Sequence, residues 1–170
     1  MDHFARLGLP AALDLEPASL DRAYFALQRQ WHPDRFVAQP PAERARASAE
    51  AAALNDAYRT LKDPLSRAVY LAELKGVELP GDGKTIDDPE LLMEAMEARE
   101  ALQEAASTDV VDVLAAKARQ AMKASLDGLG SLFLAGDKPA IRKALLRLRY
   151  LDKFAEEARA RRLNIERSGA

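Results

Sequence analysis

The chain has 170 residues, of which 48% are hydrophobic but only 6% aromatic. The hydrophobic content is enough for a buried core, and the length allows one domain or two small ones. The low aromatic content favours packed helices over sheets. The formal net charge of -2 gives no electrostatic reason to expect a nucleic-acid partner. There is no cysteine, which excludes disulfides and any thiolate ligation of zinc or an iron–sulfur cluster by this chain.

The sequence also favours no membrane partner. The first residues, MDHF, are not a basic stretch leading into a long apolar one, so we expect no signal peptide. No apolar run approaches the roughly 20 residues that a membrane-spanning helix needs. We therefore expect a cytoplasmic location.

The first 75 residues predict a helical hairpin with two short helices. A short helix closes near Gly8, and two long helices follow at 19–31 and 42–62. The second of these is rich in alanine, whose small side chain lets helices approach closely, so we expect the two to pair antiparallel. Asp63 and Pro64 then supply an N-cap and a first-turn proline for the last short helix.

The helix expected at 19–31 is amphipathic, with Ser19 as its N-cap. At about 100° per residue, its apolar side chains share one broad face: Leu20, Ala23, Tyr24, Leu27 and Trp31. Arg22, Ala26 and Arg29 fall on the opposite face. The free side of this helix is therefore predicted to be basic.

The tripeptide His32-Pro33-Asp34 follows that helix. Proline disfavours helix in the residue before it and lacks an amide donor, so it forces the chain out of the helix. His32 and Asp34 could form an acid–base pair, but no serine, cysteine or second acidic cluster accompanies them. A metal site shared with His3, the only other histidine, is a further possibility. Capping of the turn by Asp34 is the simplest structural interpretation.

Turn-forming residues interrupt the helical pattern at 76–87. We therefore expect a domain at 1–75, a linker at 76–87 and a second domain at 88–170. Three helical patterns with short connections, at 89–106, at 109–135 and after Gly136, predict an up-down-up three-helix bundle. We expect its arginine-rich end to fray.

The helix expected at 89–106 carries two apolar stripes. One is a sufficient bundle seam: Leu91, Ala95, Ala98, Leu102 and Ala105. Leu92, Met93 and Met96 lie on the other side, among carboxylates. Because a helix needs only one stripe to dock in a bundle, the second indicates a partner surface, for which flexible methionine is well suited. Packing of these three residues on the first domain or the third helix is the alternative. Tyr150 could join the same patch or cap the core.

Several segments together resemble one protein family. Residues 28–36 (QRQWHPDRF) and 54–64 (LNDAYRTLKDP) are similar to the second and third helices of J-domain co-chaperones, with the loop and turn that follow them. Narrower motifs are similar to the HscB family, the J-type co-chaperones of iron–sulfur cluster assembly: residues 1–10 (MDHFARLGLP), 67–71 (RAVYL), 91–94 (LLME) with 99–100 (RE), and 148–153 (LRYLDK). The resemblance spans nearly the whole chain. It is to the bacterial form, because this chain lacks the cysteine-rich N-terminal extension that eukaryotic relatives can carry.

The resemblance implies an all-α protein with an N-terminal J-domain and a C-terminal three-helix bundle. In the family, the J-domain engages an HscA-class heat-shock chaperone and stimulates its ATP hydrolysis. The residues that match this contact are His32, Pro33, Asp34, Arg22, Arg29 and Arg35. The bundle binds the cluster scaffold IscU, and the residues that match this surface are Leu92, Met93, Met96, Glu97, Glu100, Glu104 and Tyr150. No cofactor, metal or active site of the chain's own is implied, and the cluster is expected to sit on the scaffold.

Two positions depart from the family pattern. Met96 stands where leucine is common, a volume-conserving change. Tyr150 stands where phenylalanine is common, and its hydroxyl needs a partner or water when buried. Two other functions stay open: a general J-domain co-chaperone that binds another client or unfolded proteins, and a metal-dependent enzyme that uses His32 and Asp34.

Overall fold

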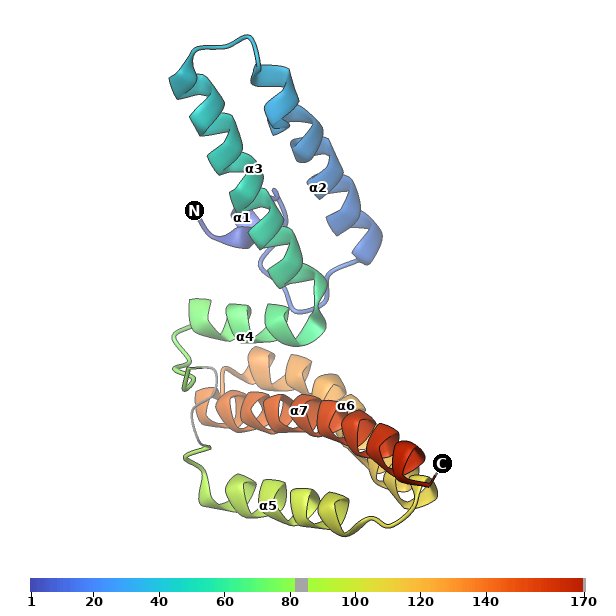
Figure 1. Ribbon diagram of the computed structural model, residues 1–170. Helices are drawn as coiled ribbons and strands as arrows, with labels where there is room; N and C mark the ends of the chain where they lie inside the picture. Colours follow the sequence, from blue (N-terminus) through green and yellow to red (C-terminus); the bar gives the residue numbers. More distant parts are fainter. Residues whose placement is uncertain (82–85, 170) are drawn as a thin grey trace. The chain divides into compact units, whose positions relative to one another are not determined.

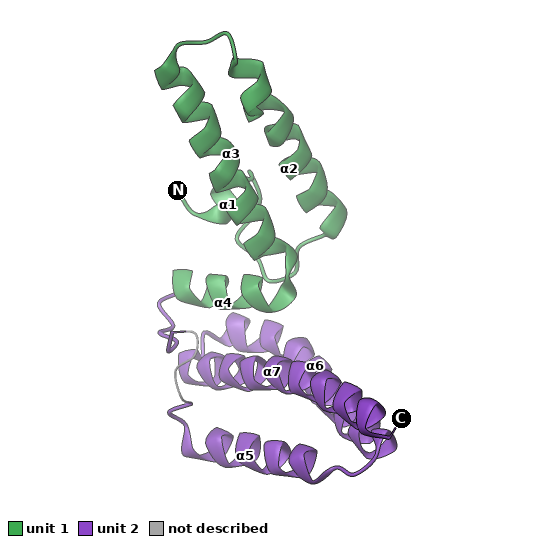
Figure 2. Cartoon of the chain, viewed as in Figure 1, with its two compact units in different colours: residues 1–74 green, residues 75–170 purple. Residues whose placement is uncertain are grey.

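The computed structural model describes residues 1–81 and 86–169, and all regular structure in these two stretches is helical. The chain divides into two compact units, Met1–Leu74 and Lys75–Ala170 (Figures 1 and 2). The all-α architecture expected from the composition is therefore confirmed. Residues 82–85 of the expected linker lie outside the described residues.

Unit 1 is a helical hairpin with shorter helices packed beside it. Its elements, in chain order, are α1 (His3–Arg6), α2 (Pro17–Trp31), the 3-10 turn η1 (Pro33–Phe36), α3 (Pro41–Lys62) and α4 (Pro64–Leu74). The long helices α2 and α3 run antiparallel, as expected, and α1 and α4 both pack against α3 (Figure 1). The buried face of α3 is mostly alanine, and its two larger buried side chains are Leu54 and Leu61. The small alanine side chains let α2 and α1 approach the same helix.

The start of α2 differs from the expectation. The helix begins at Pro17, with Glu16 in the N-cap position. Ser19 is not the N-cap but lies inside the first turn, where its hydroxyl donates a hydrogen bond to the Glu16 carboxylate at 2.5 Å. Proline suits the first helical position because its missing N–H would have no partner there. In contrast, the expected cap before α4 is confirmed: Asp63 Oδ2 accepts from Ser66 N at 2.7 Å.

Unit 2 contains the three expected helices: α5 (Pro89–Glu104), α6 (Thr108–Ala135) and α7 (Lys138–Ser168). Each begins at a side-chain N-cap that accepts from a backbone N–H three residues on; the caps are Asp88, Ser107 and Asp137. Consecutive helices run in opposite directions, so the up-down-up order is confirmed (Figure 1). Helix α7 packs against both of the others, and its contact with α6 is the more extensive one.

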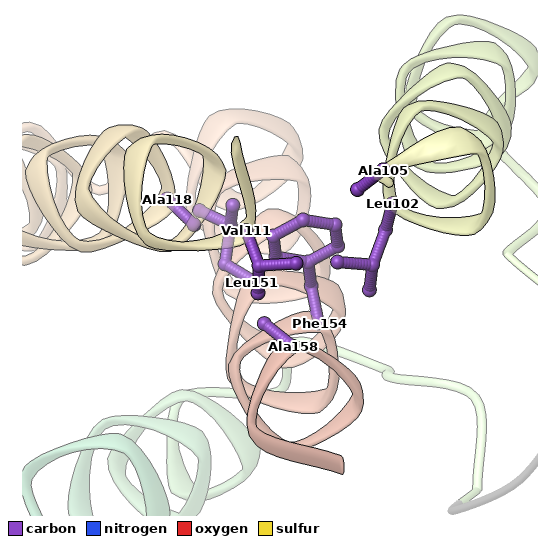
Figure 3. Packing of buried hydrophobic residues seen from close by; sticks show 7 residues of the cluster. All are labelled: Leu102, Ala105, Val111, Ala118, Leu151, Phe154 and Ala158. Carbon is purple, nitrogen blue, oxygen red and sulfur yellow. The ribbon is translucent and has the colours of Figure 1, made fainter. Parts of the chain in front are cut away.

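The cluster in Figure 3 shows where all three helices of unit 2 meet. Seven buried side chains form it: Leu102, Ala105, Val111, Ala118, Leu151, Phe154 and Ala158. Phe154 from α7 lies among the side chains of α5 and α6. Because Leu102 and Ala105 belong to the seam expected for α5, this stripe is confirmed as the side that docks in the bundle.

The stretch just before the undescribed residues is tied to α7. Val77 is buried. Arg142 Nε donates to Glu78 O at 3.0 Å, and an Arg149 guanidinium nitrogen donates to Pro80 O at 2.7 Å. These residues fall inside the linker expected at 76–87, but here they form part of unit 2.

The C-terminal end of the chain was expected to fray, but it is helical. Helix α7 continues through Ser168. Arg162 Nε donates to Asp112 of α6 at 2.9 Å, and Arg161 donates to the backbone oxygens of Gln103 and Ala105. The arginines at this end therefore hold the last turns of α7 to the helices beside them.

Candidate partner-binding surfaces

The His-Pro-Asp loop is an exposed corner between α2 and α3. His32 ends α2 and is the N-cap of η1, where its Nδ1 atom accepts from Asp34 N at 3.3 Å. Pro33 occupies the first position of η1, and all three side chains of the loop are exposed. The imidazole of His32, rather than the Asp34 carboxylate considered above, therefore caps this turn.

The two ionisable groups of the loop lie close together. His32 Nδ1 is also 3.6 Å from Asp34 Oδ2. The contact with the Asp34 amide engages Nδ1, which leaves Nε2 as the other ring nitrogen. The Asp34 side chain is 86% exposed. The loop thus presents an imidazole and a carboxylate to a partner.

Contacts behind the loop hold it in place. The rings of Trp31 and Phe36, one on each side of the tripeptide, are parallel within 5° and 6.0 Å apart. The Arg46 guanidinium of α3 lies 5.6 Å above the Trp31 ring. Arg35 donates from its guanidinium to the Arg29 carbonyl at 3.0 Å. Arg35 is therefore partly engaged in shaping the loop as well as lying on its surface.

The outer face of α2 is basic, as the sequence predicted. Arg22 and Arg29 are both exposed, and Arg22 donates to Ser19 Oγ at 3.1 Å. Phe25 lies exposed between them, a large apolar side chain that the sequence analysis did not single out. Its neighbour Tyr24 is the one that turns inward, stacking on Tyr58 of α3 with ring centroids 4.0 Å apart. This agrees with the helical angles, which place Tyr24, but not Phe25, on the apolar face of α2.

A shallow hollow of about 360 Å³ adjoins the loop. Its walls come from the loop and from the first turns of α3: Pro33, Asp34, Val37, Pro41, Arg44, Ala45 and Ser48. The sequence analysis did not predict it, because the hollow depends on how η1 meets α3. The surface around Asp34 therefore continues onto α3 rather than ending at the tripeptide.

A second surface lies on α5. Met93 and Met96 are 62% and 59% exposed, so neither packs against α7 within unit 2. Leu92 beside them is half-buried. The carboxylates expected on this side are all exposed: Glu97, Glu100 and Glu104. The structure thus brings six of the seven predicted scaffold-binding residues onto one helix, and we call these six residues the α5 outer face.

The opposite side of α5 is fixed to α7 by apolar contacts and charge pairs. Leu91 and Leu102 are buried. Three ion pairs join the helices: Glu90 with Lys143, Glu94 with Arg147 at 2.9 Å, and Arg99 with Glu157 at 3.0 Å. Because these contacts all lie on the side facing α7, they set the rotation of α5 about its own axis. That rotation turns the methionines outward.

Tyr150, the seventh predicted residue, lies on α7 and is half-buried. Its ring packs against the cluster in Figure 3, and its hydroxyl donates to Glu94. Burial, and then the hydrogen bond to Glu94, raise the pKa of Tyr150 above its ordinary value. Burial also acts to raise the pKa of Glu94, but hydrogen bonds from Arg147 and Tyr150 outweigh it and hold that pKa below the usual range. The hydroxyl is therefore engaged inside the bundle, and the sequence analysis missed its partner.

The geometry supplies no metal-binding cluster for either surface. Within residues 1–81 and 86–169, no three histidine, aspartate or glutamate side chains come together so as to hold an ion. His3 stacks on Tyr70, with ring centroids 4.4 Å apart. No helix in the described part of the chain is long and apolar enough to cross a membrane.

Comparison with known proteins gives a consistent relationship along the chain. The family model for the HSCB C-terminal oligomerisation domain matches residues 87–159. The co-chaperone protein HscB homolog of Burkholderia multivorans is 41% identical over 161 residues, covering 93% of this chain and 92% of that protein. The homolog of Cupriavidus taiwanensis is 42% identical over 159 residues, covering 92% and 90%.

Solved structures agree with the sequence relatives. The chaperone HscB from Vibrio cholerae superposes with a TM-score of 0.83 at 31% identity, covering 97% of this chain and 99% of that one. The human co-chaperone protein HscB gives a TM-score of 0.87 at 29% identity, covering 96% and 83%. The N-terminal J-domain and C-terminal helical bundle that the resemblance implied are thereby confirmed. The relationship covers both units and both surfaces, and the chain belongs to the HscB family of co-chaperones.

Proposed function

We propose that this chain binds an IscU-type iron–sulfur scaffold, delivers it to an HscA-class chaperone and stimulates that chaperone's ATP hydrolysis. The observation that carries the proposal is the α5 outer face. Met93 and Met96 are more than half exposed on a helix whose other side already supplies its docking contacts. Large apolar side chains bordered by carboxylates are typical of protein interfaces rather than of solvated surface.

The chaperone contact is proposed for unit 1. An exposed His-Pro-Asp loop lies next to a basic helix face, and the stacking of Trp31 on Phe36 supports the loop from behind. Such a surface can bind an acidic, grooved partner through long-range attraction and then specific contacts at the loop. No catalytic group is needed on this chain, because the hydrolysis belongs to the chaperone. Carrying both surfaces on one chain raises the local concentration of scaffold at the chaperone.

The scaffold contact is tested by calorimetric titration of IscU into the wild type and into a Leu92→Ala/Met93→Ala/Met96→Ala variant. We expect saturable binding by the wild type and a loss of roughly 1–2 kcal/mol for each truncation. The matched control is Val113→Ala on α6, which removes an apolar side chain that is 69% exposed in the same unit. No binding by the wild type, or binding to denatured proteins instead, would overturn the assignment of the client.

The chaperone contact is tested with His32→Gln in a steady-state ATPase assay with an HscA-class chaperone. We expect stimulation to be lost, because glutamine does not reproduce the ring that caps Asp34 N and faces the partner. Scaffold titration with the same variant should give the wild-type affinity, and thermal unfolding followed by circular dichroism should show that unit 1 is still folded. Full stimulation by His32→Gln would contradict the role of the loop.

A further inference from the structure

Two of the four methionines in the chain share one exposed face. Met93 and Met96 are three residues apart on α5, and both thioethers lie on the side that faces away from α7. Met122 is different, because it is half-buried against the cluster in Figure 3. Met1 is at the chain end. The α5 outer face therefore concentrates accessible thioether sulfur at one place.

We propose that Met93 and Met96 form an oxidation site at which a peroxide reversibly weakens binding of the client. The thioether sulfur attacks one oxygen of hydrogen peroxide, the O–O bond breaks, and the other oxygen takes up the proton of the attacked oxygen and leaves as water. The sulfur loses two electrons and becomes a sulfoxide. A dithiol reductase reverses the step: the sulfoxide oxygen leaves as water, and the dithiol is oxidised to a disulfide.

Oxidation at these two positions changes the surface without loosening the bundle. A sulfoxide is polar and accepts hydrogen bonds, so burying it against an apolar partner requires the loss of water without a matching donor. Within unit 2 neither methionine contributes to the buried core, to which α5 contributes Leu91 and Leu102 and its C-cap contributes Ala105. The modified chain should therefore keep its fold and lose affinity alone. This inference rests on the proposed scaffold-binding function of the α5 outer face.

The chain offers its own controls. Leucine at both positions keeps the apolar volume and cannot form a sulfoxide. Met122 reports whether the peroxide treatment reaches partly buried sulfur. The absence of cysteine means that no thiol of this chain competes for the oxidant.

The experiment treats the full chain with hydrogen peroxide, removes the oxidant with catalase, and only then adds IscU in the calorimeter. Peptide mass spectrometry measures sulfoxide at each methionine, and circular dichroism follows thermal unfolding. We expect Met93 and Met96 to oxidise before Met122, with the melting transition unchanged and the scaffold affinity lowered by about tenfold or more. Methionine sulfoxide reductases of both stereospecificities should restore the affinity.

The Met93→Leu/Met96→Leu variant decides the cause. Its own scaffold affinity before treatment is the reference, and peroxide should leave that affinity unchanged. Equal losses in variant and wild type, earlier oxidation of Met122, or an oxidised wild type that binds normally would each overturn the proposal while leaving the scaffold-binding function intact. If the untreated wild type does not bind IscU at all, the proposed function fails and the oxidation site falls with it.

Discussion

The Tyr150 hydroxyl on α7 donates its hydrogen bond to Glu94 on α5, and Arg147 reaches the same carboxylate at 2.9 Å. Both contacts lie on the side of α5 that faces α7, so the hydroxyl is engaged within the bundle. At this scale, Tyr150 acts on the binding surface mainly by holding α5 in place.

Replacement of Tyr150 by phenylalanine tests that role. The ring keeps its packing, but Glu94 loses one of its two donors, so the free energy of unfolding should fall by about 1 kcal/mol. Denaturant unfolding of Tyr150→Phe beside the wild type measures the change. Scaffold affinity should change less than in a Tyr150→Ala variant, which also loses the ring. A phenylalanine variant as stable as the wild type would mean that Arg147 alone is enough for Glu94.

The lowered pKa of Glu94 makes a prediction about acid stability. A carboxyl whose pKa is lower in the folded than in the unfolded state stabilises the fold when the pH is above the carboxyl's ordinary pKa of 4.5. This contribution is lost as the pH falls through the folded-state pKa. Glu94→Gln cannot titrate. The unfolding free energies of wild type and Glu94→Gln, measured from pH 7 downward, should therefore converge below about pH 4.5. Parallel curves would contradict the pKa direction.

At the scale of elements, α5 buries one face in the bundle and exposes the face proposed to bind the scaffold. Leu102 is buried against Phe154, whereas Met93 is largely exposed. Leu102→Ala should lower the free energy of unfolding by about 2–4 kcal/mol. Met93→Ala should change it by less than about 0.5 kcal/mol. Thermal or denaturant unfolding separates the two outcomes, and a large loss for Met93→Ala would place that residue in the core.

Replacement by alanine should have opposite effects on stability at two glycines, one within α6 and one at its C-terminal end. Gly136 ends the helix with a φ of 68°, and the next residue donates its N–H to Leu132 O at 3.3 Å. Alanine there is strained, so Gly136→Ala should destabilise the protein by about 1 kcal/mol. Gly128 lies within the helix, and a Cβ added to it meets nothing within 4 Å. Gly128→Ala should therefore raise the free energy of unfolding, by up to about 1 kcal/mol. A lower free energy of unfolding in both variants would refute this comparison.

A helix end could be predicted where it depends on residues close together in the sequence, and could not where it depends on residues far apart. The caps at Asp63 and Asp88 are local, because side chain and amide lie three residues apart, and both helices begin as the sequence predicted. The persistence of α7 through Ser168 is not local. It depends on Arg162 meeting Asp112, which is 50 positions away. The pattern of arginines alone therefore suggested fraying.

The same distinction holds for the candidate sites. The outward side of α5 follows from helical angles, so Met93 and Met96 could be predicted without tertiary information. The hollow beside Asp34 could not, because it depends on how η1 meets α3. The partner of the Tyr150 hydroxyl likewise comes from a different helix.

At the scale of the whole molecule, each proposed contact lies in a different compact unit, so single variants should separate the two activities. His32→Gln should bind IscU without stimulating the chaperone, and the Met93→Ala/Met96→Ala variant should stimulate it without recruiting scaffold. An equimolar mixture of the two should give only additive effects in a steady-state ATPase assay with limiting IscU, because the contacts are no longer on one chain. Full wild-type stimulation by the mixture would show that physical linkage is unnecessary.

Trp31, which stacks on Phe36 under the Arg46 guanidinium, is the only tryptophan in the chain. All indole fluorescence of this protein therefore originates beside the His-Pro-Asp loop. A chaperone that displaces Arg46 or separates the two rings would shift the emission without any attached dye. Since no natural thiol competes for a label, a single cysteine introduced on α5 could carry an acceptor dye, and each surface would then have its own optical signal.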